Sequence, residues 1–266
     1  MSKLISVNQL EICIKQEKFN VVKNVGFSLD KGKALVILGQ SGSGKTMTCH
    51  CLMGLLDPRK YAVSGEILYD GKNILKLSPK EKRLLYGGEI AFIPQNPMTA
   101  LDPSMKIGKQ ITETLSLHSD IPKNERNEAA LDALKKAGLG DVNRVFTSFP
   151  HELSGGMLQR VLIAMALMVN AKLVIADEPT TALDVVHRNE TMEAFSKMLK
   201  AGTSVLMVTH DFAAALGLGG DLIIMHEGNI VETGTVTGVL SNPRHAYTRQ
   251  LIDASVLTSG IREVAV

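Results

Sequence analysis

The amino-acid sequence predicts an α/β fold, and three kinds of segment support that prediction. Short, continuous apolar runs occupy 34–39, 173–177 and 204–210, as expected of central strands that are buried on both faces of a sheet. Other segments alternate apolar with polar residues, which is typical of half-buried antiparallel strands. Between Pro94 and Ser154 the character of the sequence changes, and within 124–140 apolar residues recur at helical spacing, so we expect a mostly helical insertion at 96–156 in the α/β domain.

The antiparallel strands are expected near the N-terminus and in two hairpins. Apolar and polar residues alternate in 4–15 and 21–30, so each segment is predicted to be a strand with one buried face. In 64–74 an Asp-Gly pair lies between two apolar pieces, which favours a tight hairpin turn. The segment 221–234 contains Glu227-Gly228 in the same place, and we predict a second hairpin there.

The insertion and the segment after it supply the predicted helices. In 124–140 apolar residues lie on one side of a helix, charged residues on the other, and glycine ends the segment. The longest apolar run, 161–176, is interrupted by Asn170 and Lys172 and is shorter than the roughly 20 residues that a membrane-spanning helix needs. We therefore expect a buried helix followed by a buried strand.

Composition narrows the class of protein. Of the 266 residues, 45% are hydrophobic and 21% are charged, which is ordinary for a folded domain. The formal net charge of +2 gives no reason to expect nucleic acid as a partner. The first residues lack the apolar core and cleavage site of a signal peptide, so we expect the chain to stay in the cytosol. The odd count of three cysteines favours reduced thiols, and Cys49 and Cys51, two apart on an expected helix, would point to different faces rather than to one metal ion.

A glycine-rich motif follows the first central strand. The letters GQSGSGKT match the pattern G-x-x-x-x-G-K-[ST] and lie between an apolar strand and an apolar helix. Glycines allow backbone N–H groups to surround phosphate oxygens, and the helix N-terminus adds favourable partial charge. Lys45 is expected to reach the β- and γ-phosphates, and the Thr46 hydroxyl to bind Mg²⁺. The predicted phosphate-binding residues are Gly39, Gln40, Ser41, Gly42, Ser43, Gly44, Lys45 and Thr46.

Polar residues end the other two central strands. Asp177 and Glu178 follow the second one, and open α/β sheets bind ligands at the carboxyl ends of their strands. Asp177 is suited to hold Mg²⁺, and Glu178 to orient and polarise an attacking water. Taken alone, Asp177 and Glu178 also fit an acidic pair that is exposed to solvent at the end of a strand and binds nothing. Gln95 lies where the sheet meets the insertion and is placed to contact Mg²⁺ and the water. His210 is placed to contact the γ-phosphate. Taken singly, each also fits a polar residue at a strand end whose hydrogen bonds are satisfied within the fold.

A second glycine pair lies more than a hundred residues later, in LSGGMLQR at 153–160. Ser154 is a suitable N-cap, and Gly155 and Gly156 expose N–H groups at the start of an apolar helix, which makes a second candidate anion site. Two such sites can serve two nucleotides, or the second can be a helix start without a ligand. The residues themselves leave both interpretations open.

The full set of motifs resembles that of the ATPase subunits of ABC transporters. The set comprises the phosphate loop, Gln95, LSGGMLQR, LVIADEP, TALD at 181–184 and His210, and its order and spacing match from about residue 4 to 235. The resemblance implies a P-loop NTPase fold: a RecA-like core with an antiparallel β subdomain, and a helical subdomain that carries the signature motif LSGGMLQR. It implies ATP and Mg²⁺ as cofactors. The implied catalytic residues are Glu178, Lys45, His210 and Gln95, and the implied Mg²⁺ ligands are Thr46, Gln95 and Asp177.

The resemblance also implies a domain organisation and partners. It divides the chain into a nucleotide-binding core at 1–95 and 157–235, a helical subdomain at 96–156 and a C-terminal tail at 236–266. In that family two ATPase subunits pack head to tail, and the signature motif of one closes on the ATP of the other. The residues implied to act on the partner's ATP are Ser154, Gly155, Gly156 and Gln159, with Asp184 at the dimer interface.

Further partners follow from the same resemblance. The second ATPase subunit is expected to be a similar but distinct chain, which makes a heterodimer. Two transmembrane permease subunits and, indirectly, an extracytoplasmic substrate-binding protein complete the implied complex, with the chain at the cytoplasmic face of the cell membrane. An aromatic residue usually stacks on adenine in this family. Phe19 is the aromatic residue in the corresponding loop at 15–20, and its role is left open.

The end of the chain indicates the cargo. The letters NPRHAYTRQLI at 242–252 resemble the ending of ATPases from peptide and nickel importers. No cysteine follows Cys51, and the chain stops soon after this motif, which resembles nickel-import ATPases and importers of metal–metallophore complexes. The alternative is the ATPase subunit of an oligopeptide or dipeptide importer. A soluble ABC-type ATPase that acts on DNA or ribosomes is expected to carry long coiled coils or zinc-binding cysteines, and a P-loop kinase does not explain LSGGMLQR.

Overall fold

The structure is a computed structural model, and it describes residues 2–181 and 183–259. The chain forms two compact units, each described by itself below. Unit 1 is made of the described residues of Met1–Leu77 and Leu206–Val266, and unit 2 is Ser78–Val205. Unit 2 also takes in strands and helices on both sides of the insertion, so its bounds differ from those of the helical subdomain expected at 96–156. The division into core, helical subdomain and tail stays a prediction.

Unit 1 contains an antiparallel sheet with the strand order β2-β1-β4-β5. Its strands are β1 (Lys3–Ile14), β2 (Phe19–Asp30), β4 (Tyr61–Tyr69) and β5 (Lys72–Asn73). Ile5 pairs with Leu29 of β2 on one side and with Tyr69 of β4 on the other, and all three side chains are buried. The turn between β4 and β5 has positive φ at both central residues, 46° at Asp70 and 81° at Gly71. The predicted strands and hairpin are confirmed.

Unit 1 also contains strands in the order β10-β9-β3-β8. They are β3 (Ala34–Leu38), β8 (Ser204–Thr209), which contains the boundary between the units, β9 (Asp221–His226) and β10 (Asn229–Thr235). All five residues of β3 are buried, and β3 runs parallel to β9. Strands β9 and β10 form the second predicted hairpin, whose turn residues Glu227 and Gly228 have φ of 47° and 80°.

Short helices join and follow these strands. Helix α1 (Lys45–Leu52) begins inside the glycine-rich motif, and α8 (Phe212–Leu218) follows β8. A 3-10 turn, η1 (Ile74–Lys76), comes after β5. The C-terminal tail, whose packing could not be predicted, contains α9 (Val236–Ser241) and α10 (Ala246–Ser259), and Tyr247 and Leu251 of α10 are buried.

Unit 2 combines strands in the order β8-β7-β6 with a group of helices. Strand β6 (Ile90–Ile93) pairs in parallel with β7 (Leu173–Asp177), and every residue of β7 is buried. The helices and 3-10 turns are α2 (Pro79–Leu85), η2 (Pro97–Thr99), α3 (Ile107–His118), α4 (Arg126–Lys136), α5 (Val142–Thr147), η3 (Pro150–Glu152), α6 (Gly155–Met168) and α7 (Val185–Lys200).

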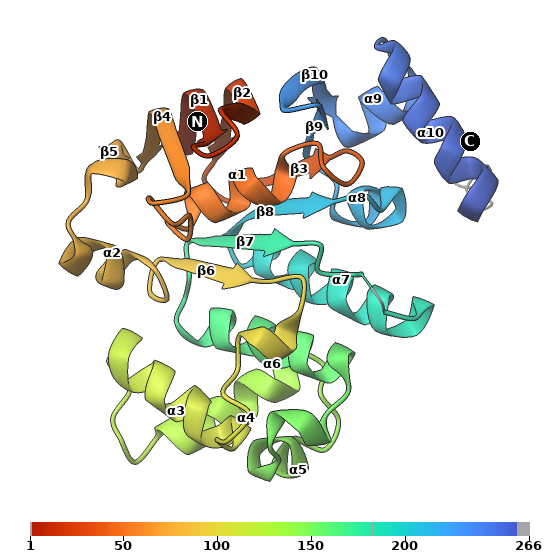
Figure 1. The fold of residues 1–266 in the computed structure, drawn as a ribbon. Helices are drawn as coiled ribbons and strands as arrows, with labels where there is room; N and C mark the ends of the chain where they lie inside the picture. Colours follow the sequence, from red (N-terminus) through yellow and green to blue (C-terminus); the bar gives the residue numbers. More distant parts are fainter. Residues whose placement is uncertain (1, 182, 260–266) are drawn as a thin grey trace. The chain divides into compact units, whose positions relative to one another are not determined.

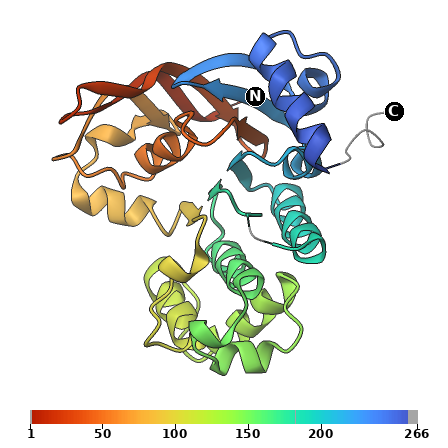
Figure 2. The same ribbon diagram turned by 45° about the vertical axis from the view of Figure 1, so that its right-hand side comes forward.

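The predicted helical insertion is present. Helices α3, α4 and α5 gather beside α6 in unit 2, as Figures 1 and 2 show. The amphipathic segment forms α4, and Gly138 follows it with a φ of 82°. The long apolar run forms most of α6 and then β7, as predicted. Within residues 2–181 and 183–259, none of the helices has both the length and the apolar character required to cross a bilayer.

Candidate nucleotide-binding site

The glycine-rich motif forms the loop between β3 and α1 in unit 1, and two of its glycines are required by close backbone contacts. A Cβ atom on Gly39 would lie 2.3 Å from the Met225 carbonyl oxygen, and one on Gly44 would lie 2.7 Å from the Val21 carbonyl oxygen. Gly44 also has a φ of 102°, and Gly42 a φ of 82°. At Gly42, by contrast, a Cβ atom would meet nothing within 4 Å. The loop is therefore packed closely at both ends and open in the middle.

Lys45 and Ser43 show how the polar groups of the loop are arranged. The Lys45 ammonium donates hydrogen bonds to the carbonyl oxygens of Gly39 (2.8 Å) and Gln40 (2.9 Å), and the residue is 4% exposed. The buried Ser43 hydroxyl has no hydrogen-bond partner among the residues that the structure describes. Thr46 lies in the first turn of α1, where its side chain is half-buried. A cationic amine, an unsatisfied hydroxyl and a helix N-terminus suit an anion such as a phosphate.

The turn of the β9–β10 hairpin belongs to the same unit as the phosphate loop and is hydrogen-bonded to it. The Gly228 N–H donates to the Ser43 carbonyl at 3.0 Å, and the Gly228 carbonyl accepts from the Lys23 N–H at 2.7 Å. A Cβ atom on Gly228 would come within 2.7 Å of the Val21 carbonyl oxygen, so only glycine fits this turn. The sequence indicated the hairpin, but not that its turn packs on the phosphate loop.

His210, the other predicted site residue in unit 1, follows the last residue of β8 and is exposed. The backbone beside it is fixed by Asp211. The Asp211 N–H donates to the Thr209 hydroxyl at 2.9 Å, and its carboxylate accepts from the Ala213 N–H at 2.8 Å, which caps α8. This arrangement holds His210 at the carboxyl end of a buried strand, as the sequence predicted.

In unit 2, the predicted acidic pair and Gln95 follow two neighbouring strands. Ile93 of β6 pairs with Ala176 of β7 in parallel, so both strands end at the same edge. Exposed Gln95 comes two residues after β6, Asp177 ends β7 with 2% exposure, and Glu178 follows with 7% exposure. The structure thus brings Gln95 to the strand edge that also carries the two acids.

Glu178 has an unusual backbone conformation. Its φ is 50°, in the left-handed region that residues other than glycine, asparagine and aspartate rarely adopt. The Thr181 hydroxyl donates to the Glu178 carboxylate at 3.2 Å, and the Thr181 N–H donates to its carbonyl at 3.1 Å. Strained conformations of this kind cost about 1–3 kcal/mol and cluster at functional sites. The turn therefore holds a nearly buried carboxylate in one orientation at the end of β7.

The second glycine pair begins α6. The Ser154 hydroxyl accepts a hydrogen bond from the Met157 N–H at 3.3 Å, which confirms Ser154 as the N-cap. Gly155 is exposed, and a Cβ atom there would meet nothing within 4 Å. Gly156 is buried, and its Cβ would lie 2.9 Å from Cδ2 of His187. Gln159 is also buried, at 2% exposure, so in this single chain its side chain faces the interior of unit 2.

His187 connects the second glycine pair with Asp184. Asp184 caps α7, because its carboxylate accepts the His187 N–H at 2.9 Å, and the same carboxylate lies 2.8 Å from Nδ1 of His187. The backbone hydrogen bond from His187, and then the one from its side chain, hold the pKa of the Asp184 carboxyl below its usual value. Since the imidazole also lies close to Gly156, the starts of α6 and α7 pack against each other. The sequence did not indicate this role for His187.

A second anchor of α6 is Arg160, the last residue of LSGGMLQR. Its guanidinium donates to the Gly138 carbonyl at 3.1 Å and to the Glu190 carboxylate of α7, and its side chain is 7% exposed. A nearly buried guanidinium needs such partners, because an unpaired charge is costly to bury. Arg160 therefore ties α6 to the end of α4 and to α7.

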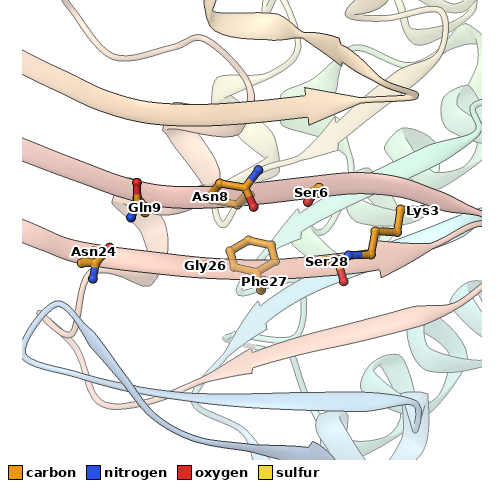
Figure 3. A pocket seen from close by; sticks show the side chains of 9 residues that line it. Lys3, Ser6, Asn8, Gln9, Asn24, Gly26, Phe27 and Ser28 are labelled. Atoms are coloured by element: carbon orange, nitrogen blue, oxygen red, sulfur yellow. The ribbon is translucent and has the colours of Figure 1, made fainter.

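The surface of unit 1 has a pocket that is lined by residues of β1 and β2. It has a volume of about 440 Å³ and lies on β1 and β2, lined mainly by polar side chains such as Asn8, Gln9 and Asn24, together with Phe27 (Figure 3). It contains none of the predicted site residues. Within the described ranges there is no cluster of three or more His, Cys, Asp or Glu side chains suited to a metal ion. Cys49 and Cys51 are buried, and neither forms a disulfide among the described residues.

The donor atoms present fit Mg²⁺ and ATP chemically. Thr46 offers a hydroxyl in unit 1, and Asp177 and Gln95 offer a carboxylate and an amide oxygen in unit 2, which are the oxygen ligands that Mg²⁺ prefers. Phe19, predicted to lie in a loop, is instead the first residue of β2; it is 53% exposed, with the Lys23 ammonium 5.8 Å from its ring centre. It presents an accessible aromatic surface in the unit that holds the phosphate loop.

Comparisons with known proteins show which family the chain belongs to. Residues 22–181 match the ABC transporter family. The chain is 43% identical to the oligopeptide transport ATP-binding protein OppD of Bacillus subtilis over 95% of its own length and 72% of that protein. It is 37% identical to the metal-staphylopine import system ATP-binding protein CntD of Staphylococcus aureus over 94% of its own length and 92% of that protein.

Solved structures give the same result for the fold. The ATP-binding cassette MJ0796, in a dimeric post-hydrolysis state bound to ADP and phosphate, superposes with a TM-score of 0.77 at 28% identity, over 87% of this chain and 98% of that one. The predicted fold, a P-loop NTPase with an antiparallel β subdomain and helical parts, is confirmed. A phosphate loop, a strand-end pair of acids and a glycine-paired helix start lie in one cassette fold. The chain belongs to the ABC transporter family.

Proposed function

We propose that the chain is the ATP-hydrolysing subunit of an ABC importer. The observation that carries the proposal is the presence of two glycine-flanked helix starts, at α1 and α6, that are chemically suited to anions, together with a nearly buried Glu178 in a strained turn after β7. One phosphate loop suffices to bind a nucleotide, so the second site needs a separate explanation. A head-to-tail dimer, in which α6 of one subunit meets the nucleotide of the other, supplies it.

Each residue has a role that its chemistry supports. Lys45 would move its ammonium from the loop carbonyls to the β- and γ-phosphates, where it balances negative charge. Glu178, held by Thr181, would orient the attacking water and accept its proton. Gln95 and His210 would contact the water and the γ-phosphate. Mg²⁺, when bound by Thr46 and Asp177, would neutralise charge that develops on the phosphates.

The dimer is proposed to use the start of α6 in trans. Ser154 and Gly155 are exposed, and Gly155 has open space around it, as a surface that receives another subunit's phosphate requires. Gln159 would have to reorient to take part. Asp184 would lie at the interface, beside the exposed side chains of Val185 and Val186, each 65% exposed. The dimeric state of the MJ0796 cassette supports this arrangement.

For the cargo, we propose either nickel itself or a complex of nickel or another metal with a metallophore, which a substrate-binding protein delivers to the permease subunits. The likeness to the metal-staphylopine import protein CntD supports this proposal. The second candidate is an oligopeptide or dipeptide, which the 43% identity to OppD favours. In either case the ATPase subunit works at the cytoplasmic face of the membrane and is not expected to contact the cargo.

The role of Glu178 is tested by Glu178→Gln. The amide keeps the size of the side chain but cannot accept a proton, so we expect ATP to bind as in the parental chain while turnover falls by about 10²–10⁴-fold. The matched control is Glu193→Gln, which removes a carboxylate from the exposed face of α7. ATPase assays and equilibrium binding of radiolabelled ATP measure the two effects. Turnover of the Glu178 variant near the parental rate would show that another group activates the water.

The cargo is tested in the reconstituted complex of ATPase and permease subunits with the binding protein. Stimulation of ATP hydrolysis is compared for binding protein loaded with a nickel–metallophore complex and with short peptides. We expect stimulation by the nickel-loaded form alone. Stimulation by peptides alone would overturn the metal proposal in favour of the peptide candidate and leave every residue role above in place.

A further inference from the structure

The C-terminal motif NPRHAYT reaches the phosphate loop. Tyr247, the second residue of α10, is 7% exposed, and its hydroxyl accepts a hydrogen bond of 3.1 Å from the backbone N–H of Gln40. Gln40 is the second residue of the phosphate loop, 207 positions earlier in the chain. Both residues belong to unit 1. The contact therefore joins the tail to the loop within one compact unit.

The Tyr247 ring is held in place by its neighbours. It stacks on the His226 imidazole, with ring centres 3.7 Å apart and planes inclined by 23°. His226 ends β9, the strand that pairs with β3, and β3 leads directly into the phosphate loop. The Tyr247 N–H also donates to Nδ1 of His245 at 3.2 Å. The hydroxyl is thus presented to Gln40 by a ring with little freedom to turn.

The segment before α10 is itself tied to β10. The Glu232 carboxylate accepts hydrogen bonds from the N–H groups of Arg244 (2.8 Å) and His245 (3.0 Å). One charged side chain therefore anchors two successive backbone donors just ahead of Tyr247. Bonds of this kind to a carboxylate are stronger than those between neutral groups. The chain of contacts runs from β10 through residues 244–247 to the loop.

The backbone of Gln40 is held on both sides. Its N–H donates to Tyr247, and its carbonyl accepts from the Lys45 ammonium at 2.9 Å. A rotation of the peptide units around Gln40 would therefore disturb both contacts. We infer that Tyr247 is a positioning residue for the phosphate loop, through which the C-terminal segment fixes the backbone of Gln40 and the resting place of the Lys45 ammonium. The inference rests on the proposed function only in assigning this loop to ATP.

The test removes the hydroxyl and keeps the stacked ring, with Tyr247→Phe. Tyr61→Phe is the matched control, since it removes a tyrosine hydroxyl from the first residue of β4 in the same unit. Hydrogen exchange of the Gln40 amide, followed by NMR without nucleotide, should be about three- to tenfold faster in the Tyr247 variant and unchanged in the control. Unchanged exchange at Gln40 would overturn the inference, whether or not the chain binds ATP.

Enzyme kinetics supply the functional half of the test. Because a looser loop has to be ordered when the nucleotide binds, the dissociation constant and KM for ATP should rise about three- to tenfold in Tyr247→Phe, while kcat at saturating ATP stays within about twofold. A purely structural role would lower stability without this division between KM and kcat. His226→Ala, which keeps the hydroxyl but removes the stacking partner, should shift KM in the same direction. A parental KM in both variants would overturn the inference.

Discussion

Alanine at Gly44 should mainly lower stability and alanine at Gly42 should mainly weaken ATP binding, because the two glycines serve the phosphate loop for different physical reasons. Both have positive φ, 102° and 82°, so alanine is strained at either position. At Gly44 the new methyl group would also lie 2.7 Å from the Val21 carbonyl oxygen. At Gly42 the methyl group would enter open space, on the part of the loop where the proposed phosphates need close access to backbone N–H groups.

The expected losses of stability follow from the strain of positive φ and from the close contact at Gly44. Positive φ costs an alanine about 1–2 kcal/mol relative to glycine. The Gly44 methyl group meets a strand backbone that cannot rotate away, and forced overpacking costs roughly a further 1–3 kcal/mol. We therefore expect Gly44→Ala to lower the free energy of unfolding by about 2–5 kcal/mol and Gly42→Ala by about 1–2 kcal/mol. Gly42→Ala should nevertheless weaken ATP binding by more than tenfold, since the methyl group occupies the approach of the phosphate.

Urea unfolding and nucleotide binding separate the two effects. The chain has no tryptophan, so unfolding is best followed by circular dichroism. Binding is measured with radiolabelled ATP at a temperature where both variants remain folded. If the two variants lost the same stability, the contact with Val21 would not be the reason for glycine at position 44. Parental ATP affinity in Gly42→Ala would refute the assignment of this loop to phosphate.

Local pattern was sufficient to predict most of the fold. The buried runs became β3, β7 and β8 because continuous apolar segments bounded by turn residues fit strands covered on both faces. The two hairpins followed from glycine after an acidic residue, and in both turns φ is positive at the two central positions. These features depend on neighbours within a few residues, so a single sequence contains the information. The motif residues of the candidate site were predicted on the same kind of local information.

The contacts that support the site depend on residues far apart in the chain. No local pattern links Tyr247 to Gln40 or places the His187 ring over Gly156, because each pair meets only after the whole unit has folded. The strained backbone of Glu178 was likewise unpredictable from residue type, since glutamate rarely adopts positive φ. Such positions are expected where function competes with local preference.

Two further predictions concern the anchors of α6 and of the tail. Arg160→Met should lower the free energy of unfolding by about 1.5–3 kcal/mol, because it removes charge-assisted hydrogen bonds from a nearly buried side chain. The control Lys197→Met, which removes one member of an exposed ion pair, should lower it by less than about 1 kcal/mol. Equal losses of stability in urea unfolding would show that Arg160 does not anchor α6. The second prediction is a pH dependence at Glu232. Burial raises the pKa of this carboxyl, but the neighbouring Thr248 side chain and the hydrogen bonds from the backbone N–H groups of residues 244–245 outweigh it and lower the pKa from its ordinary 4.5. A lowered folded-state pKa stabilises the fold above the ordinary value, and that contribution is lost as the pH falls through the folded-state value. The parental chain and Glu232→Gln should therefore differ in the free energy of unfolding well above pH 4.5, and the two free energies should become equal below it. A difference that did not change with pH would mean that the charge on Glu232 does not hold the tail.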